Sequence, residues 1–352
     1  SPGHTALGGN IYRKGMLDFQ AEIEKAIAAL DFVNDPEALD KHEELRAMHI
    51  AADALMGYAA RYVKLLEEAA ATETDARRRA ELEQMAENCR RVPAHAPQTF
   101  WQALQYYWFV HVGVISELNP WDSFNPGRLD QHIYPFYRNE VDAGLLDAEG
   151  ARELLQAFWI KFNNHPAPPK VGVTAHESCT YTDFALINVG GVTRDGADAV
   201  NELSYLILDV VQDMRLLQPS SMVQLSAKNP DRFIKRALRI VRTGYGQPSI
   251  FNTEAIIQEL LRQGKSIEDA REGGASGCVE AGAFGREAYI LTGYFNLPKI
   301  LELALNDGVD PRTGRQLGPR TGDPRTFTEF EQVYAAFEKQ LRHFVDIKIR
   351  GN

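Results

Sequence analysis

The first third of the chain carries hydrophobic residues at the spacing of amphipathic helices. Residues 36–71 repeat them every three or four positions, which predicts one long helix. Residues 73–91 are densely charged and are expected to form a second helix that is exposed to solvent. Pro93 and Pro97 then break the pattern. The aromatic stretch that opens at Phe100 is too apolar for a surface helix, so a buried helix is predicted there.

The middle of the chain alternates short apolar runs with helical patterns. Residues 119–135 are rich in proline and are expected to form a loop. Strands are predicted at 184–189, 221–225 and 249–251. Helices are predicted at 153–163, 199–214, 230–242 and 253–263, and a last one from Phe327 to Val345. This alternation favours an α/β fold with parallel strands, whose catalytic groups gather on loops at the strand ends.

The composition limits the classes of partner. The 352 residues carry a formal net charge of -10, and no run of lysine or arginine stands out. Nucleic acids and anionic membranes need a basic face, so neither is an expected partner. No apolar stretch reaches the length of a membrane span, so no membrane helix is expected. The two ends resemble cuts through a longer protein, and no signal peptide is recognisable, which favours the cytoplasm.

The three cysteines suggest neither a disulfide framework nor a metal site. Cys89 lies in the charged helix and Cys179 in a polar stretch, but Cys278 lies in residues 273–285, which contain five glycines. Glycine allows close approach of the backbone to a ligand or another loop. If this loop is extended, the Cys278 thiol and the Glu280 carboxylate point the same way, which suits radical or nucleophilic chemistry beside a proton-transfer group. The alternative is a packed cysteine in an ordinary turn.

The segment Gly277-Cys278-Val279-Glu280 resembles the finger-loop motif of the glycyl radical enzymes, the pyruvate formate-lyase-like superfamily. Neither a phosphate loop nor a dinucleotide fingerprint occurs in the sequence to compete with this interpretation. Further segments that resemble the superfamily lie at 126–137, 218–221, 246–249 and 289–296. The resemblance therefore covers essentially the whole chain.

The resemblance implies a fold and an assembly. The fold is part of a ten-stranded α/β barrel of two antiparallel half-barrels, with a helical N-terminal part and the cysteine finger loop inside. Residues 1–352 are then a fragment of one barrel domain, without its upstream part and without the C-terminal glycyl radical domain. A radical-SAM activating enzyme installs the glycyl radical outside this sequence, and no cofactor binds the fragment itself. A homodimer is implied, and the fragment alone is expected to be inactive.

The resemblance also implies roles for residues. Cys278 is the thiyl-radical residue that takes a hydrogen atom from a small organic substrate, and Glu280 is a base or acid for a hydroxyl or carboxylate. Arg128 and Asp130 are expected to pair with each other or to cap a helix. Turn chemistry and structural roles are the alternatives for the candidate substrate contacts. These candidates are Ser123, Asn125, Gln218 and Ser220.

The residues around the motif bear on the subclass. Pyruvate formate-lyase carries two adjacent cysteines here, whereas residue 277 is glycine, so that subclass is disfavoured. The Cys-x-Glu form occurs in radical eliminases and arylacetate decarboxylases. Residues 282–289 resemble the branch that holds isethionate sulfite-lyase, dihydroxypropanesulfonate sulfolyase and the arylacetate decarboxylases, and residues 162–164 and 170–173 resemble the sulfolyases within it. The sequence hypothesis is therefore C–S cleavage of a hydroxyalkylsulfonate with release of sulfite.

Several alternatives to C–S cleavage stay open on sequence. An arylacetate decarboxylase of the 4-hydroxyphenylacetate type and a choline- or diol-type eliminase use the same Cys-x-Glu motif. An inactive structural fragment explains the sequence without any catalysis. A redox module that uses Cys278 as a sensor is a further alternative, and it requires an exposed thiol with a lowered pKa.

Overall fold

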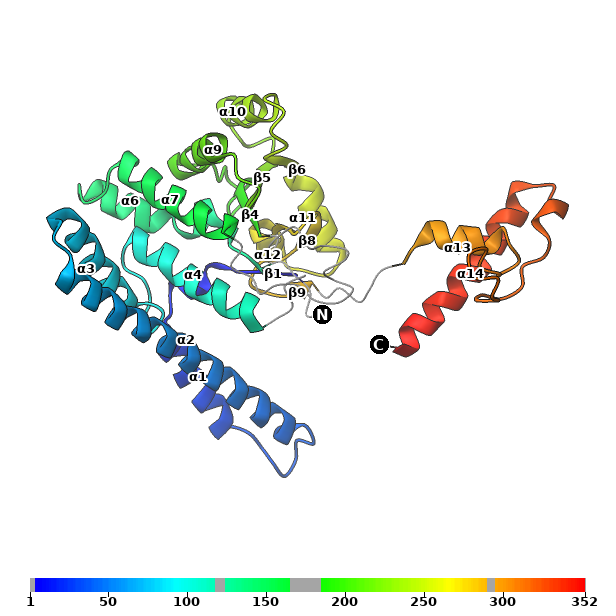
Figure 1. Cartoon of the computed structure of the whole chain (residues 1–352), viewed down its shortest axis with the longest axis horizontal. Helices are drawn as coiled ribbons and strands as arrows, with labels where there is room; N and C mark the ends of the chain where they lie inside the picture. The colour runs from blue at the N-terminus through cyan, green and yellow to red at the C-terminus, as the bar shows by residue number, and fades with distance from the viewer. Residues whose placement is uncertain (1–3, 118–123, 165–184, 290–294, 352) are drawn as a thin grey trace. The chain divides into compact units, whose positions relative to one another are not determined.

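The computed structural model describes residues 4–117, 124–164, 185–289 and 295–351 (Figure 1). The chain divides into two compact units, residues 1–290 and residues 291–352. The first unit contains the parallel sheet and the cysteine motif, and the second contains two helices and a long loop. The predicted domain division, with all of residues 1–352 in one domain and the glycyl radical domain outside the sequence, stays a prediction.

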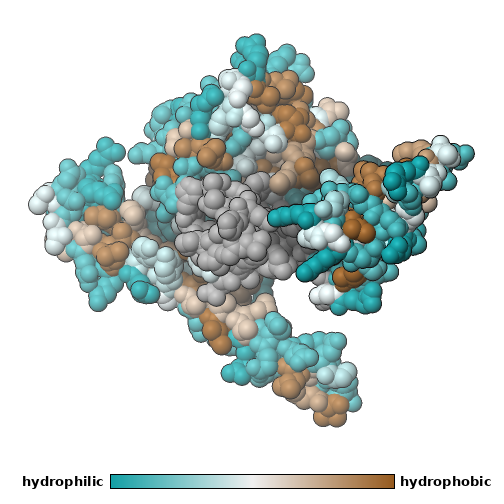
Figure 2. All heavy atoms as spheres, turned by 45° about the vertical axis from the view of Figure 1, so that its right-hand side comes forward, coloured by the Kyte–Doolittle hydropathy of each residue, from teal (hydrophilic) through white to brown (hydrophobic). Residues whose placement is uncertain are grey.

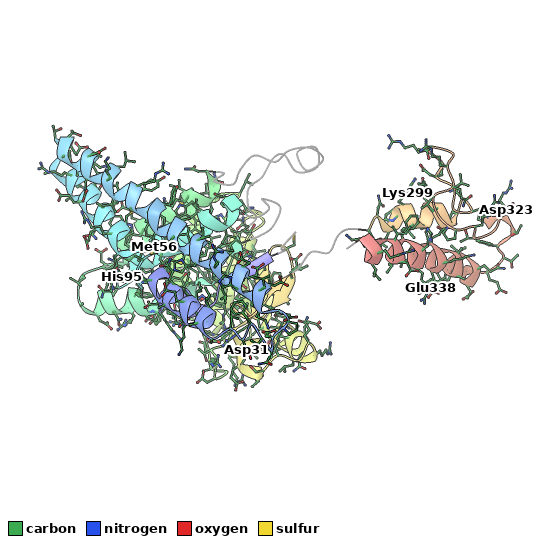
Figure 3. All side chains as sticks on the ribbon, turned by 90° about the horizontal axis from the view of Figure 1, so that it is seen from below. Asp31, Met56, His95, Lys299, Asp323 and Glu338 are labelled. Atoms are coloured by element: carbon green, nitrogen blue, oxygen red, sulfur yellow. The ribbon has the colours of Figure 1, made fainter. Side chains whose placement is uncertain are left out.

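The N-terminal part of the first unit is helical, as the hydrophobic spacing predicts. It contains a 3-10 turn and four helices: Gly9–Tyr12, α1 Met16–Ala28, α2 Ala38–Thr72, α3 Ala76–Arg91 and α4 Phe100–Glu117. Asp75 precedes helix α3 and caps it, because its carboxylate accepts a hydrogen bond of 2.7 Å from the Arg78 backbone N–H. Met56 of α2 packs against the core of this unit (Figure 3). Tyr106 and Tyr107 of α4 are fully buried, which confirms the predicted buried helix.

The segment 119–135, which is predicted to be a loop, contains regular structure over its described part. Two short strands are followed by two helices: β2 Phe124–Asn125, β3 Gly127–Arg128, α5 Leu129–His132 and α6 Tyr134–Asp142. The prediction was wrong because a strand of two residues is too short to show alternation. Pro135 also misled it, since this proline lies in the first turn of α6, where no backbone donor is needed.

A parallel sheet with the strand order β3-β4-β5-β6 forms the centre of the first unit. Its longer strands are β4 Leu186–Gly190, β5 Ser220–Leu225 and β6 Ser249–Asn252. The predicted parallel pairing is confirmed. Helices α9 (Glu202–Met214) and α10 (Asp231–Val241) connect β4 to β5 and β5 to β6 (Figure 1). Such crossovers are needed because consecutive parallel strands start at the same edge of the sheet. Helix α7 (Ala148–Asn163) precedes them and begins earlier than predicted, at the Asp147 cap.

Alternate residues of β4 and β5 point to opposite faces of the sheet. Ile187, Val189 and Val223 are buried in the main hydrophobic core of the unit. Leu186 and Met222 point to the other face, where they join a second buried cluster. That cluster also contains residues of α11 (Thr253–Arg262), of α12 (Ile267–Glu272) and of a strand beyond them: Ile256, Leu260, Ala270 and Ala275. Both faces are therefore covered, which explains why these strands show no polar alternation in sequence.

A smaller sheet lies beside the parallel one. Its central strand β1 (His4–Ala6) pairs in parallel with β2 and antiparallel with β9 (Ala288–Tyr289). The backbone N–H of Leu7 extends this pairing with a hydrogen bond of 3.0 Å to the Asn125 carbonyl. The sheet thus joins the start of the described chain to the strand that carries Asn125.

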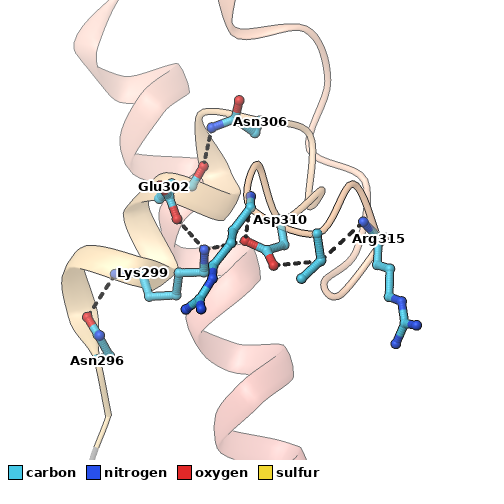
Figure 4. A network of polar contacts seen from close by, with 8 residues as sticks. Asn296, Lys299, Glu302, Asn306, Asp310 and Arg315 are labelled. Atoms are coloured by element: carbon cyan, nitrogen blue, oxygen red, sulfur yellow. Dashed lines mark hydrogen bonds and ion pairs between the residues drawn. The ribbon is translucent and has the colours of Figure 1, made fainter.

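The second unit is built on helices α13 (Leu297–Ala304) and α14 (Phe330–Gly351), with the 3-10 turn Pro324–Thr326 in the loop between them. Asp310 holds this loop through hydrogen bonds from Lys299 and Thr313 (Figure 4). These two donors lower the pKa of Asp310 to about 2, so the carboxylate is ionised at neutral pH. The loop is therefore organised by a charge-assisted network.

Helix α14 begins at Phe330, after the predicted start at Phe327. Its hydrophobic stripe is only partly covered, since Phe330 and Tyr334 are exposed. Figure 3 shows Lys299 on α13 and Glu338 on α14, the two helices that pack against each other within this unit. The short helix α13 therefore covers only part of this stripe.

None of the helices within the described ranges is long and apolar enough to cross a membrane. Some hydrophobic side chains are exposed on the surface of α2, for example Met48 and Ile50. Figure 2 shows that hydrophilic residues separate the hydrophobic patches on the face in view. Ile50 lines an apolar groove with residues of α4, and Met48 lines another with residues of α1.

Candidate active site

Cys278 lies at the tip of a hairpin, which we call the finger hairpin and define as residues 273–282. Its strands are β7 (Gly274–Ser276) and β8 (Glu280–Gly282), which pair antiparallel with Ser276 opposite Glu280. Gly277 opens the turn with a φ of 56°, a left-handed conformation that favours glycine. The Cys278 side chain is exposed. The sequence therefore folds this segment into a tight hairpin that presents the thiol at its end.

The Glu280 carboxylate bends back over the turn that carries the thiol. Its Oε2 atom accepts hydrogen bonds from the backbone N–H groups of Cys278 and Val279, at 3.0 Å and 2.9 Å. The extended loop assumed from sequence was wrong, since residues 277–279 form a turn. The expected neighbourhood is nevertheless present, because the two hydrogen bonds hold the carboxylate next to the residue that carries the thiol.

The environment of Cys278 favours the protonated thiol. Partial burial and then the nearby Glu280 charge raise the pKa of the Cys278 thiol. A cysteine that acts as a nucleophile or as a redox sensor needs a lowered pKa, because its reactive form is the thiolate. A donor of a hydrogen atom needs the S–H bond instead. The pKa shift therefore disfavours the sensor alternative and suits hydrogen-atom transfer.

The other cysteines differ from Cys278. Cys89 is buried in α3, and burial raises the pKa of its thiol to about 11, in line with the inert cysteine expected there. Cys179, Ser123 and the segment 170–173 lie outside the described residues. Across the described ranges, no group of three His, Cys, Asp or Glu side chains is arranged to hold a metal ion.

Asn125, a predicted substrate contact, holds the end of β7 that lies next to the turn of the finger hairpin. Its side-chain N–H donates to the Ser276 hydroxyl oxygen at 2.6 Å, and its Oδ1 atom accepts from the Leu186 backbone N–H at 2.6 Å. Asn125 and Ser276 are both completely buried. The amide thus links the finger hairpin to β4 of the central sheet. Contact of Asn125 with substrate stays a prediction.

Two further buried amides extend this arrangement along β7. The Asn188 side chain of β4 accepts from the Ala275 backbone N–H at 3.1 Å and donates to the Ala275 carbonyl at 2.9 Å. The Gln224 side chain of β5 donates to the Gly273 carbonyl at 3.0 Å. We call Asn125, Asn188 and Gln224 the amide ladder. It binds Gly273, Ala275 and Ser276 of the finger hairpin to three different strands.

Sequence reasoning missed Asn188, Gln224 and Ser276. A signal was present, because Asn188 and Gln224 each follow apolar residues within a buried strand. A polar side chain in such a strand must find a hydrogen-bond partner within the protein. Which partner it finds depends on contacts between segments far apart in sequence, and no local pattern contains that information.

Gln218 and Ser220 lie at the start of β5. Ser220 pairs with Leu186, the residue whose backbone N–H is bound by Asn125. Along β5, Ser220 also shares a face with Met222 and Gln224, the face that carries the finger hairpin. Ser220 therefore lies at the same end of the sheet as the contact between Asn125 and Ser276, next to the hairpin turn. The Gln218 side chain accepts a hydrogen bond from the Ser220 N–H at 3.2 Å, and substrate contact by either residue stays a prediction.

Arg128 and Asp130 are both buried and serve the framework. The Arg128 guanidinium donates to the backbone carbonyls of Gly190, Val192 and Arg271, which ties β4 to α12. The Asp130 carboxylate accepts from the Gly190 N–H at 2.8 Å and from the Ser204 hydroxyl. Both side chains therefore bind groups of other segments, which neither a simple pair of Arg128 with Asp130 nor a helix cap would require.

Gly274 is a point where the ladder leaves no room for a side chain. A Cβ atom there would lie 2.3 Å from the Asn188 Oδ1 atom and 2.6 Å from the Gln224 Nε2 atom. We expect Gly274→Ala to destabilise the protein by about 1–3 kcal/mol, because the buried amides must shift. Thermal unfolding of the complete protein measures this loss.

The matched control for Gly274→Ala is Gly57→Ala in the interior of helix α2, where a Cβ atom would meet nothing within 4 Å. That change is expected to leave stability unchanged or to raise it by up to about 1 kcal/mol, because alanine favours helix. Equal destabilisation by the two substitutions would contradict the close packing of the ladder against Gly274.

The whole chain, residues 1–352, matches the family described as pyruvate formate lyase-like. The chain belongs to this family. A solved glycyl radical enzyme from Archaeoglobus fulgidus has a TM-score of 0.87 and 32% identity, and the match covers 99% of this chain and 44% of that chain. The expected membership of the glycyl radical enzymes and the expected fold, a fragment of their α/β barrel with a helical N-terminal part, are confirmed.

Relatives within the pyruvate formate lyase-like family differ in reaction. The trans-4-hydroxy-L-proline dehydratase of Clostridioides difficile is 56% identical over 352 residues, which are 100% of this chain and 45% of that protein. A crystal structure of hydroxyproline dehydratase from that organism, with trans-4-hydroxy-L-proline bound, has a TM-score of 0.95 and covers the same shares. The isethionate sulfite-lyase of Oleidesulfovibrio alaskensis is 32% identical over 343 residues, 95% of this chain and 41% of that protein. The chain thus spans less than half the length of these relatives.

Proposed function

We propose that this chain supplies the hydrogen-abstracting cysteine of a glycyl radical dehydratase, whose substrate is trans-4-hydroxy-L-proline or a close analogue. The observation that carries the reaction type is the finger hairpin, which presents a protonated Cys278 thiol beside the Glu280 carboxylate. The substrate assignment is supported by 56% identity to a hydroxyproline dehydratase over the full chain. The sulfonate hypothesis drawn from sequence has weaker support, since the isethionate lyase is only 32% identical.

The position of Cys278 is compatible with oxidation of its thiol by a protein glycyl radical. A glycyl radical, which is expected outside this sequence, would supply the oxidation, and Cys278 would give up its thiol hydrogen atom to it. The exposed position of Cys278 at a hairpin tip makes its S–H bond accessible to such a partner and to substrate. An activating radical-SAM enzyme and a homodimer are part of the same proposal.

The chain's own residues then perform the elimination. Cys278, as a thiyl, takes a hydrogen atom from a substrate carbon next to the carbon that bears the hydroxyl. The C–O bond breaks as the Glu280 carboxylate takes a proton from the substrate and passes it to the leaving oxygen, which departs as water, so Glu280 ends in its starting ionised form. The product radical takes a hydrogen atom back from the Cys278 thiol. The net change is loss of one water molecule, and the thiyl is regenerated.

The function is tested with the complete protein after anaerobic activation. Its glycyl radical is first quantified by electron paramagnetic resonance. The protein is then given trans-4-hydroxy-L-proline or isethionate in separate reactions, with dehydration followed by mass spectrometry and sulfite by a colorimetric assay. We expect dehydration of hydroxyproline and no sulfite.

Sulfite release without hydroxyproline dehydration would replace the proposal with C–S cleavage, the second candidate. No turnover of either substrate by protein that carries the radical would overturn both substrate assignments. It would direct attention to the decarboxylase and the diol or choline eliminase alternatives. Absence of any radical after activation would favour the inactive fragment.

A further inference from the structure

Among the strands of the described residues, none pairs with the outer edge of the finger hairpin. Within an antiparallel pair, successive residues direct their backbone groups alternately toward the partner strand and away from it. The Ala275 N–H and carbonyl are both bound by the Asn188 side chain, so they point away from β8. Side-chain amides thus take the place of a third strand at this edge.

This arrangement is fully buried, so each of its contacts matters for the hairpin. Asn125, Asn188 and Ser276 are 0% exposed, and Gln224 is 1% exposed. A buried backbone group without a hydrogen-bond partner lowers the stability of the fold. The amide side chains therefore favour the one placement of β7 in which every partner is found. A shift of β7 by one residue would exchange the faces of the hairpin and break these bonds.

The contact nearest the thiol is the one between Asn125 and Ser276. Ser276 is the last residue of β7, and only Gly277 separates it from Cys278. Asn125 is in turn fixed by the Leu186 N–H of the central sheet. A continuous path of short hydrogen bonds therefore runs from the sheet to the base of the turn that carries the thiol.

We propose that Asn125 is a positioning residue for Cys278, which acts through Ser276 to fix the hairpin tip relative to the central sheet. The role deepens the proposed function and rests on it, because it assigns to Asn125 the placement of the reacting sulfur. It also differs from the substrate contact expected for Asn125 from sequence. Displacement of a reacting group by about 1 Å can lower a rate by roughly 100-fold, so loss of this contact has a measurable effect.

The test is a double-mutant cycle in the complete protein with Asn125→Ala, Ser276→Ala and the double variant. We expect each single variant to lower kcat by about 10- to 100-fold, with KM within about 2-fold of wild type and the glycyl radical content unchanged. The double variant should be no slower than the slower single variant, because both remove the same contact. Ser276→Ala removes only one oxygen atom, so its kcat still tests the proposal even if Asn125→Ala fails to fold.

A second measurement does not depend on turnover. Hydrogen–deuterium exchange of the peptide 273–282, in protein that has not been activated, should be faster in both single variants than in wild type. Asn229→Ala is the matched control, since Asn229 is also a buried amide, which accepts from the Ser226 N–H and donates to Gly191 and Asp198 but makes no hydrogen bond with the finger hairpin, all of whose residues the structure describes. Exchange of the peptide 273–282 and kcat should be unchanged in this control.

Two results would overturn the positioning role. The first is a raised KM in Asn125→Ala, combined with a loss of kcat in the double variant that equals the product of the two single losses. This result would indicate that Asn125 contacts the substrate independently of Ser276. The second is unchanged exchange of the peptide 273–282 in both single variants. If wild-type protein fails to dehydrate hydroxyproline, the proposed function fails, while the exchange measurement still decides whether Asn125 fixes the finger hairpin.

Discussion

Cys278→Ser is expected to reduce turnover of the complete, activated protein below detection. Serine has nearly the shape of cysteine, so the turn after Gly277 should form normally. The hydroxyl O–H bond is much stronger than the thiol S–H bond, and a glycyl radical cannot remove its hydrogen atom at a useful rate. Product formation by mass spectrometry measures the loss. Electron paramagnetic resonance should show that the variant still carries the glycyl radical.

The control for this substitution is Cys89→Ser. Cys89 is also a free thiol, but it is buried in helix α3 and its raised pKa keeps it protonated and inert. Burial of a hydroxyl there is expected to cost about 1–3 kcal/mol of stability without loss of turnover per radical. Substantial activity in Cys278→Ser, or equal loss in both variants, would remove Cys278 from the reaction.

Glu280→Gln is expected to lower kcat by about 100- to 10,000-fold, the usual contribution of a proton-transfer group. The substitution is well suited to the site, because the glutamine side-chain oxygen can still accept the hydrogen bonds from the Cys278 and Val279 N–H groups. The hairpin should therefore keep its conformation while the proton-carrying group is lost. Steady-state kinetics of the activated protein measure kcat, and hydrogen exchange of the finger hairpin verifies its conformation.

Glu287→Gln provides the comparison for Glu280→Gln. The Glu287 carboxylate also accepts a backbone hydrogen bond in this region, from the Ala283 N–H at 2.8 Å, and it pairs with Lys265. It is not part of the finger turn, so Glu287→Gln should retain most of the activity. If Glu280→Gln is as active as this control, the carboxylate does not transfer a proton in the rate-limiting part of the reaction.

Long helices and buried strands could be predicted from sequence because their patterns are local. The helix predicted over 36–71 and the strand predicted over 221–225 appear as α2 and β5 with small differences at their ends. Strands β2 and β3 could not be predicted in this way, since each has only two residues. They exist because neighbouring strands pair with them, which is a tertiary effect.

The candidate site also contains residues that could be predicted from sequence and contacts that could not. Cys278 and Glu280 stand out in sequence because a cysteine and a carboxylate lie together in a glycine-rich segment. The contact between Asn125 and Ser276 joins residues 151 positions apart, and nothing local to either residue indicates it. Asn125 was selected for its residue type and neighbourhood, but the structure shows that its amide serves the hairpin. The glycyl radical family is thus readable from sequence, but the predicted C–S cleavage has weaker support than dehydration, and the contacts that place the thiol require the fold.

The most direct test of the account is a crystal structure of the complete protein, prepared without the radical, with trans-4-hydroxy-L-proline bound. The account predicts that the Cys278 sulfur contacts a ring carbon next to the hydroxyl-bearing carbon. It also predicts that the Glu280 carboxylate lies within hydrogen-bond distance of a polar group of the substrate. A substrate that binds with its ring away from the finger hairpin, and touches neither Cys278 nor Glu280, would contradict the account.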